Sequence, residues 1–221
     1  MRIFLDTADV NDVAMRFATG LIDGVTTNPS LIRKSGKNPV DVYKELRDIG
    51  ILDISMEVVG DVGTMYHEAV KLHREFPDVA TIKLPCTKDG LQVCNSLSEQ
   101  GIRTNITLIF SAAQAILAAK AGATYVSPFV GRCDDNSVAG VEVVRSIAEV
   151  YRVHNVQTKI LAASIRDVYK VTRSFYNGAD IVTMPVSVFD RMYDHVLTRE
   201  GLDIFQKDHE QTLSQFRLGE K

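Results

Sequence analysis

One lysine of this sequence lies inside an apolar run, where a charged side chain is uncommon. Lys83 stands in the segment VATIKLP, between Ile82 and Leu84. Burying an ammonium group is costly unless it is paired or neutral, and a nearby cation such as Arg132 also favours the neutral amine. A neutral amine can attack a ketone and form a Schiff base. The alternative is that Lys83 leaves the strand and reaches solvent, and the residue alone supports either interpretation.

Two carboxylates stand at the ends of other apolar runs. Asp6 follows the first run and Glu57 lies in the last part of the third. Schiff-base chemistry on a sugar needs proton transfers at several atoms, which two carboxylates and a hydroxyl could share. Each carboxylate also has a purely structural interpretation. Asp6 could cap a helix, since Asp9 lies close by, and Glu57 could form a simple salt bridge with Lys83.

Two arginines and a serine in the second half of the sequence follow apolar runs and could bind an anion. The guanidinium groups of Arg132 and Arg166 match phosphate oxygens in a bidentate geometry. Ser164 is expected at the start of a helix, where backbone N–H groups also attract anions. The alternative is that Ser164 only caps that helix and that the arginines pair with Asp134 or Asp167. Two arginines on adjacent loops favour the phosphate site.

Uncharged polar groups complete the set of strand ends. They are the side chains of Thr26, Asn28, Asn105, Thr107 and Ser127. In an α/β barrel the chemistry lies at the carboxyl ends of the strands, so these groups are expected to converge with Lys83 on one mouth. We assign Thr7, Thr87 and Thr183 to turns or helix caps, and Cys86 to packing because no histidine is placed to activate its thiol.

Eight short apolar runs alternate with helical patterns along the chain. They span residues 3–5, 21–25, 51–59, 79–84, 102–106, 123–126, 156–162 and 180–182. Such alternation is typical of a parallel sheet, and runs that are apolar throughout indicate strands buried on both faces. Eight units in about 195 residues predict an α/β fold, a (β/α)8 TIM barrel, with residues 1–221 as a single domain. An amphipathic segment, 198–216, is expected to form an extra C-terminal helix.

Local signals refine this prediction. Asn28 and the proline after it resemble the start of a helix, Ser111 and Gln114 form a capping box, and Asp134 or Asp135 is expected to cap the helix after the sixth run. The rival architecture is an open, doubly wound sheet, which usually has a glycine-rich phosphate loop after its first strand. The first turn here reads DTAD, so the barrel is favoured.

Composition argues against several classes of function. The chain has 221 residues and a net charge of −3, which predicts no general attraction to nucleic acid or to an acidic membrane. Three cysteines without paired spacing predict a reducing, cytoplasmic location. The beginning of the chain does not resemble a signal peptide, and no run of about 18 uncharged apolar residues predicts a membrane span. The five histidines form no zinc motif, so no metal site is expected.

The motifs together resemble the transaldolase family, in particular its short branch, which includes fructose-6-phosphate aldolases. The matching segments, in chain order, are FLDTAD, GVTTNPS, TIKLP, TNITLIFS, VSPFVGR and AASIR. The resemblance implies a Schiff base on Lys83, acid–base roles for Asp6, Glu57 and Thr107, and substrate contacts from the remaining strand-end residues, Thr26, Asn28, Asn105, Ser127, Phe129, Arg132, Ser164 and Arg166. It implies no metal and no organic cofactor.

The resemblance also implies an activity. Glu57 and Phe129 match transaldolases, whereas the aldolases have a glutamine and a tyrosine there. The expected reaction moves a dihydroxyacetone unit between sugar phosphates of the pentose phosphate pathway. The alternatives are an aldolase that releases free dihydroxyacetone and a non-catalytic sugar-phosphate-binding barrel. In the short branch the final helix commonly reaches a neighbouring subunit, so a ring-built homo-oligomer such as a decamer is expected. The segment 198–216 is equally compatible with capping its own barrel.

Overall fold

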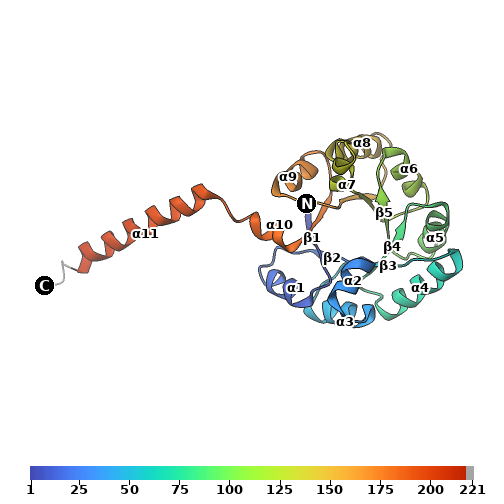
Figure 1. Ribbon diagram of the computed structural model, residues 1–221, viewed down its shortest axis with the longest axis horizontal. Coiled ribbons are helices and arrows are strands. Elements are labelled where there is room, and N and C mark those ends of the chain that lie inside the picture. Colours follow the sequence, from blue (N-terminus) through green and yellow to red (C-terminus); the bar gives the residue numbers. More distant parts are fainter. Residues whose placement is uncertain (218–221) are drawn as a thin grey trace.

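The computed structural model describes residues 1–217 and shows a closed barrel of eight parallel strands inside a layer of helices (Figure 1). The strands follow the chain order around the barrel, and β8 closes it by pairing with β1. The predicted (β/α)8 barrel is therefore confirmed. The strands are β1 (Arg2–Asp6), β2 (Gly24–Thr26), β3 (Ile54–Glu57), β4 (Ala80–Pro85), β5 (Thr104–Ile109), β6 (Tyr125–Pro128), β7 (Lys159–Ala162) and β8 (Ile181–Met184).

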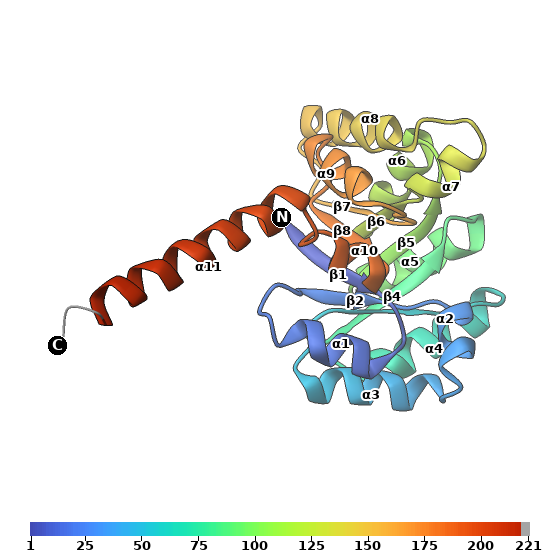
Figure 2. The ribbon, with the colours of Figure 1, turned by 60° about the vertical axis from the view of Figure 1, so that its left-hand side comes forward.

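Helices follow each strand and cover the outside of the barrel (Figures 1 and 2). They are α1 (Val10–Phe17), α2 (Pro29–Ser35), α3 (Pro39–Ile49), α4 (Val62–Glu75), α5 (Lys88–Ser98), α6 (Ala112–Lys120), α7 (Val130–Asp135), α8 (Gly140–Val153), α9 (Val168–Tyr176), α10 (Val186–Arg191) and α11 (Val196–Arg217). The predicted N-cap is present, because Ser111 Oγ accepts the N–H of Gln114 at 3.3 Å. Gln114 Oε1 accepts the N–H of Phe110, the residue before the cap, at 2.8 Å, so the capping box is shifted by one residue. The main apolar core lies between these helices and the strands.

Most strands begin later than the apolar runs that predicted them, and in four cases a helix ending accounts for the difference. After α3, Gly50 takes a positive φ and the N–H of Ile51 bonds the carbonyl of Leu46 at 3.2 Å. This six-to-one bond is the Schellman ending of a helix, in which an apolar residue past the left-handed position packs against the helix. The same bond joins residues 102 and 97, 123 and 118, and 156 and 151. The first apolar residues of these runs therefore belong to helix endings.

The segment after β6 also differs from its prediction. Asp134 and Asp135 end the short helix α7, and α8 begins only at Gly140. Neither aspartate is the residue directly before the long helix, which is Ala139. Asp134 still caps α8 from a distance, because its Oδ1 accepts the N–H of Gly140 at 3.0 Å. A backbone N–H at the start of α8 is therefore bonded by a side chain six residues earlier, instead of by the residue directly before the helix.

The barrel interior is apolar in the middle and polar at both ends. Phe4, Leu161 and Ile181 are fully buried in the middle layer. At the amino ends of the strands, buried Asp53 accepts hydrogen bonds from Thr81 Oγ1 at 2.8 Å and Tyr125 OH at 2.7 Å. Alternate residues of a strand face the same side. The next inward-facing residue after the apolar layer on each strand therefore lies at the mouth formed by the carboxyl ends.

The last helix extends away from the barrel. Figures 1 and 2 both show α11 projecting from the molecule, and all its residues from Leu202 to Phe216 are exposed. The predicted extra C-terminal helix is confirmed, two residues longer at its start and one at its end. The alternative that it caps its own barrel is wrong, because the helix carries its apolar side chains into open space.

Candidate active site

Lys83 stays inside the barrel and is held by two polar partners. Its Nζ lies 2.8 Å from Glu57 Oε2, and it donates a hydrogen bond of 3.0 Å to the carbonyl of Thr27. The side chain is only 7% exposed and that of Glu57 is 14% exposed. The two residues face each other across paired strands, since Glu57 on β3 is in register with Lys83 on β4. The structure therefore excludes a lysine that reaches solvent, and the carboxylate offsets the cost of burying the amine.

Asp6 lies at the carboxyl end of β1, in the same mouth. Its Oδ1 accepts a hydrogen bond of 2.8 Å from Thr26 Oγ1, and the two residues are in register on β1 and β2. Burial raises the pKa of Asp6 above its ordinary value; the charge of Lys83 and the Thr26 hydrogen bond act to lower it, and the charge of Glu57 raises it. The helix cap after β1 comes from Asp9 instead, which leaves Asp6 free of that role.

A buried hydrogen-bond network fixes the amide of Asn105. Ser127 Oγ donates to Asn105 Oδ1 at 2.7 Å, and Asn105 Nδ2 donates to Ser55 Oγ at 3.2 Å. This pattern sets which side of the amide carries the nitrogen and which the oxygen. Ser55, two residues before Glu57 on β3, was not among the predicted site residues. The strand alternation that placed Glu57 inside could have identified it.

The hydroxyl of Thr107 is buried and has no hydrogen-bond partner among the described residues. A buried hydroxyl without a partner is costly, so its position suits a water or a substrate group. Thr107 lies beside an irregularity in β5, where the register to β6 shifts between Ile106 and Ile109 and Leu108 has a φ of 60°. Such bulges redirect side chains and are common next to functional sites.

Asn28 both caps a helix and lines the mouth, and the predicted start of α2 is confirmed. Its side-chain oxygen accepts the N–H of Leu31 at 3.0 Å, and Pro29 occupies the first helical position. The oxygen is thereby committed to the helix, whereas the Nδ2 group has hydrogen atoms left to donate. Asn28 can therefore donate a hydrogen bond to an oxygen atom bound in the mouth.

The rim after β6 carries Phe129 and Arg132. The Arg132 guanidinium carbon lies 5.0 Å from the centre of the Phe129 ring, and Phe110 meets that ring edge-on at 5.9 Å. Arg132 forms no ion pair within residues 1–217, so its charge is available to an anion. The prediction that Arg132 pairs with a neighbouring aspartate, the alternative to phosphate binding, is thus not realised here.

Arg166 and Ser164 differ from their predictions. Arg166 forms a bidentate ion pair with Asp135 on the outside of the mouth, and its side chain is 55% exposed. Ser164 does not start a helix, because α9 begins at Val168 with Asp167 as its cap. Ser164 has a φ of 57° and its carbonyl accepts the N–H of Gly131 at 3.0 Å. Ser164 therefore lines the mouth from a loop rather than from a helix terminus.

The mouth forms a cavity of about 140 Å³. Eight of the twelve predicted site residues line it, and Glu57 and Asn105 contact the lining residues Lys83 and Ser127. Thr107 and Arg166 are not part of the lining. The lining consists of Asp6, Thr26, Asn28, Lys83, Ser127, Phe129, Arg132, Ala163, Ser164 and Thr183. Thr183 was assigned to a turn or cap, and this is wrong, because it lies within β8 and is buried.

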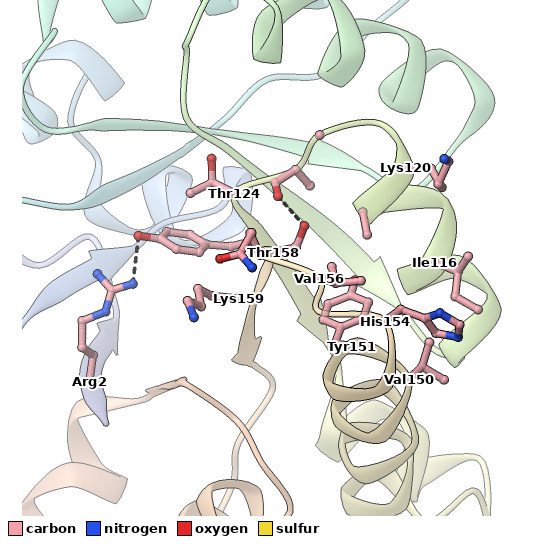
Figure 3. A pocket seen from close by; sticks show the side chains of 15 residues that line it. Arg2, Ile116, Lys120, Thr124, Val150, Tyr151, His154, Val156, Thr158 and Lys159 are labelled. Atoms are coloured by element: carbon pink, nitrogen blue, oxygen red, sulfur yellow. Dashed lines mark hydrogen bonds between the residues drawn. The ribbon is translucent and has the colours of Figure 1, made fainter.

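A larger hollow, about 930 Å³, opens between α6 and α8 at the amino ends of the strands (Figure 3). Tyr151, Val150 and Val156 line its apolar part, and Arg2 and Lys159 lie at its far side. Its described lining contains no carboxylate, and its two lysines, Lys120 and Lys159, are exposed rather than buried beside an acid. The smaller cavity at the opposite end is accordingly the candidate active site.

The described part of the chain offers neither a cluster of metal ligands nor a membrane-spanning helix. Residues 1–217 contain no group of three or more histidine, cysteine, aspartate or glutamate side chains placed to hold a metal ion. None of the described helices combines the length and the apolar character needed to cross a bilayer.

Comparison with known proteins gives consistent results. The family model described as transaldolase/fructose-6-phosphate aldolase matches residues 3–220. A protein of Erythrobacter litoralis named "Probable transaldolase" is 49% identical over 213 residues, covering 96% of this chain and 98% of the relative. One of the same name from Methanococcus maripaludis is 46% identical, covering 94% of this chain and 97% of the relative.

A solved structure supports the fold alone. The thiamine phosphate pyrophosphorylase from Pyrococcus furiosus superposes with a TM-score of 0.57 at 16% sequence identity. The match covers 83% of this chain and 85% of that one. Identity this low carries no information on activity, because one barrel fold supports many unrelated chemistries.

Proposed function

This chain belongs to the transaldolase/fructose-6-phosphate aldolase family, and we propose that it is a transaldolase that acts through a Schiff base on Lys83. It takes a dihydroxyacetone unit from a ketose phosphate, such as fructose 6-phosphate or sedoheptulose 7-phosphate. It passes the unit to an aldose phosphate, such as erythrose 4-phosphate or glyceraldehyde 3-phosphate. The observation that carries the proposal is the buried amine of Lys83, 2.8 Å from Glu57, in a cavity that Asp6 also lines.

The first step forms the covalent intermediate. A proton moves from the Lys83 ammonium to Glu57, and the neutral amine attacks C2 of the ketose. The resulting carbinolamine loses water to give an iminium ion. Glu57 supplies the proton that converts the departing hydroxyl into water, and the buried, unpartnered hydroxyl of Thr107 holds that water.

The second step breaks the carbon chain. Asp6 removes the proton of the C4 hydroxyl, the C3–C4 bond breaks, and its electron pair moves to the iminium nitrogen to form an enamine. An aldose phosphate leaves with a new aldehyde at the former C4. The enamine then adds to the acceptor aldehyde by the reverse sequence, and hydrolysis releases the new ketose.

Amides and hydroxyls around Lys83 hold the three-carbon unit. Asn105, oriented by Ser55 and Ser127, and the free Nδ2 group of Asn28 hydrogen-bond its hydroxyl groups. Thr26 acts on the base, through its hydrogen bond to Asp6.

Positive groups at the rim hold the phosphate of either aldehyde. Arg132 is unpaired among the described residues and lines the cavity together with Ser164. Arg166 contributes when its guanidinium group releases Asp135 and binds the phosphate, since it can form two parallel hydrogen bonds to either a carboxylate or a phosphate. Of the three groups, Arg132 is therefore expected to contribute most in the arrangement observed.

The transaldolase assignment over the aldolase rests on two positions. Glu57 and Phe129 occupy positions where the aldolase branch has glutamine and tyrosine. A phenylalanine supplies no hydroxyl to place water or a proton on the enamine, so the enamine persists until an aldehyde arrives. The aldolase that releases dihydroxyacetone is the second candidate, supported by the shared family model. A non-catalytic binding barrel is disfavoured by the buried amine between two carboxylates.

A coupled assay separates these candidates. Fructose 6-phosphate is supplied with and without erythrose 4-phosphate, and glyceraldehyde 3-phosphate is measured. Transaldolase activity gives product only when erythrose 4-phosphate is present. Equal product without the acceptor would identify an aldolase, and the interpretation of Glu57 and Phe129 would be wrong. Binding of the ketose with no product under either condition would indicate the binding barrel.

The proposal extends to the oligomeric state of the protein and to its location in the cell. A cytoplasmic homo-oligomer in which α11 contacts a neighbouring subunit accounts for the exposed apolar stripe of that helix. Leu202, Phe205, Leu213 and Phe216 recur at helical spacing on one face and are all exposed. A ring, or two such rings joined as a decamer, is the form that head-to-tail contacts give when they close.

A further inference from the structure

Thr183 is a buried hydroxyl of the mouth to which the reaction above gives no role. It lies on β8, is 2% exposed, and lines the cavity. Its Oγ1 is 2.7 Å from Thr26 Oγ1, which is in turn 2.8 Å from Asp6 Oδ1. The three side chains thus form a hydrogen-bonded chain that runs from β8 through β2 to β1.

The direction of the hydrogen bonds follows from the number of hydrogens. An ionised Asp6 can only accept, so the one hydroxyl hydrogen of Thr26 points to Asp6. The bond between the two threonines is then possible only if Thr183 donates to Thr26. A hydroxyl that accepts one hydrogen bond donates a stronger one, because the bonds polarise each other.

The strand itself does not require a hydroxyl at this position. Thr183 faces Phe4 in the parallel register with β1, and a valine would fill the same volume with a similar preference for β-structure. Losing the hydroxyl would instead leave an oxygen lone pair of Thr26 without a donor. The hydroxyl of Thr183 therefore serves Thr26, and through it the carboxylate.

We propose that Thr183 is a positioning residue for the general base: its hydroxyl orients Thr26 toward Asp6 and so tunes how readily Asp6 accepts the C4 hydroxyl proton. The inference rests on the proposed function, since it takes Asp6 as that base. Burial opposes the charge on Asp6 and the Thr26 hydrogen bond opposes the effect of burial, so the supply of this hydrogen bond matters to the carboxylate. Thr183 acts through Thr26 and takes no part in forming the Schiff base.

The test uses Thr183→Val, which removes the hydroxyl at nearly constant volume. We expect cleavage of fructose 6-phosphate, with acceptor present, to slow by about fivefold, the effect of losing one hydrogen bond. The acid limb of the pH–rate profile should move to higher pH. Borohydride trapping of dihydroxyacetone on Lys83 should be unchanged, because that step does not use Asp6.

Two further variants control the experiment. Thr183→Ser keeps the hydroxyl and should restore the wild-type pH profile. Thr158→Val removes a buried hydroxyl that bonds the carbonyl of Ala123 at 2.8 Å at the other end of the barrel, and should leave the profile unchanged. If Thr183→Val does not fold, as judged by thermal unfolding, Thr183→Ala provides the same comparison.

An unshifted acid limb in Thr183→Val would overturn the proposal, as would loss of trapping together with loss of cleavage, since that pattern indicates a merely structural role. Absence of any trapped adduct in the wild-type protein is a different result. It would contradict the proposed function itself, and the two failures are therefore distinguishable.

Discussion

Asp6 is subject to opposing influences at the mouth of the barrel. Burial raises the pKa of its carboxyl, and the positive charge of Lys83 and the hydrogen bond from Thr26 partly reverse this effect. A base with a raised pKa accepts a proton more readily, but it is also protonated at a higher pH. The same residue thereby gains strength as a base and loses activity earlier on acidification.

The first prediction concerns pH. Cleavage should fall as the pH decreases through the raised pKa of Asp6, at a pH above the ordinary aspartate value of about 3.9. In Asp6→Asn cleavage should be lost across the whole pH range while trapping on Lys83 persists. The measurement is the pH–rate profile of the acceptor-dependent reaction. A wild-type rate that stays constant down to the ordinary aspartate range would contradict this role of Asp6.

The same pKa direction predicts a change in stability. A carboxyl with a raised pKa in the folded state binds its proton more tightly there than in the unfolded chain, so stability decreases as pH rises through that pKa. Asp6→Asn removes this cost, and its unfolding temperature should exceed that of the wild type at pH 8. The difference should shrink as the pH is lowered toward the ordinary aspartate pKa. A variant less stable than the wild type at pH 8 would refute it.

The sequence identified most mouth residues because strand ends of a barrel converge. Lys83, Asp6 and Glu57 come together as expected, since Asp6 and Glu57 end their strands and Lys83 on β4 is in register with Glu57 on β3. The ion pair of Arg166 with Asp135 was not predicted, because the sequence cannot tell which of several aspartates a long side chain reaches. Thr183 was misjudged because a threonine near a strand end also fits a turn, and only the three-dimensional neighbour Thr26 reveals its role.

A glycine allows two loops of the mouth to pack closely together. Gly131, at the start of α7, donates its N–H to the carbonyl of Ser164 at 3.0 Å. A Cβ on Gly131 would lie 2.2 Å from that carbonyl oxygen and 2.8 Å from Arg166 Nε, closer than atoms can approach. The absence of a side chain therefore sets the spacing between the loop of Arg132 and that of Ser164.

The next prediction is that Gly131→Ala separates these loops and weakens phosphate binding. The KM for phosphorylated aldehydes should rise by about tenfold, since a small misplacement disrupts bidentate contacts. Trapping of unphosphorylated dihydroxyacetone on Lys83 should be retained. The matched control is Gly63→Ala on α4, where the new Cβ would meet nothing closer than 3.7 Å. Unchanged KM values in Gly131→Ala would show that the contact between Gly131 and Ser164 is not needed for phosphate binding.

Element boundaries were predicted less well than element types. The alternation of strands and helices gave the order of the barrel, but the apolar residues after helix endings were counted as strand. Ile51 and Val156 are apolar because they pack at Schellman endings, and an apolar residue looks the same in either setting. Backbone hydrogen bonds separate the two cases, and these are not visible in the sequence.

The whole molecule has two unlike parts, a barrel whose apolar residues are largely covered and a helix whose apolar residues are not. The 22 residues of α11 project from the barrel, and Phe205 is 70% exposed. Exposed apolar side chains on one helical face are unfavourable in an isolated molecule and indicate a contact surface. The sequence predicted the helix but left its partner open, because amphipathic spacing does not identify what covers it.

A last prediction about the molecule as a whole concerns assembly. A chain that ends at His195 lacks α11 and should sediment as a smaller species than the full chain, while it still forms the trapped adduct on Lys83. Replacing Leu202 and Phe205 together by glutamate should have the same effect, and replacing exposed Lys207 of the same helix by glutamine should not. Analytical ultracentrifugation measures the masses. A full chain that is monomeric over a wide concentration range would rule out the proposed role of α11.

The most direct test of the account is to trap the intermediate. The protein is incubated with fructose 6-phosphate or dihydroxyacetone, reduced with borohydride, digested, and analysed by mass spectrometry, with Lys83→Ala and Lys120→Ala as parallel samples. We predict a reduced three-carbon unit on Lys83 in the wild type and in Lys120→Ala, and no adduct in Lys83→Ala. An adduct that survives in Lys83→Ala, or a wild-type protein that turns over its substrates without any adduct, would contradict the Schiff-base mechanism.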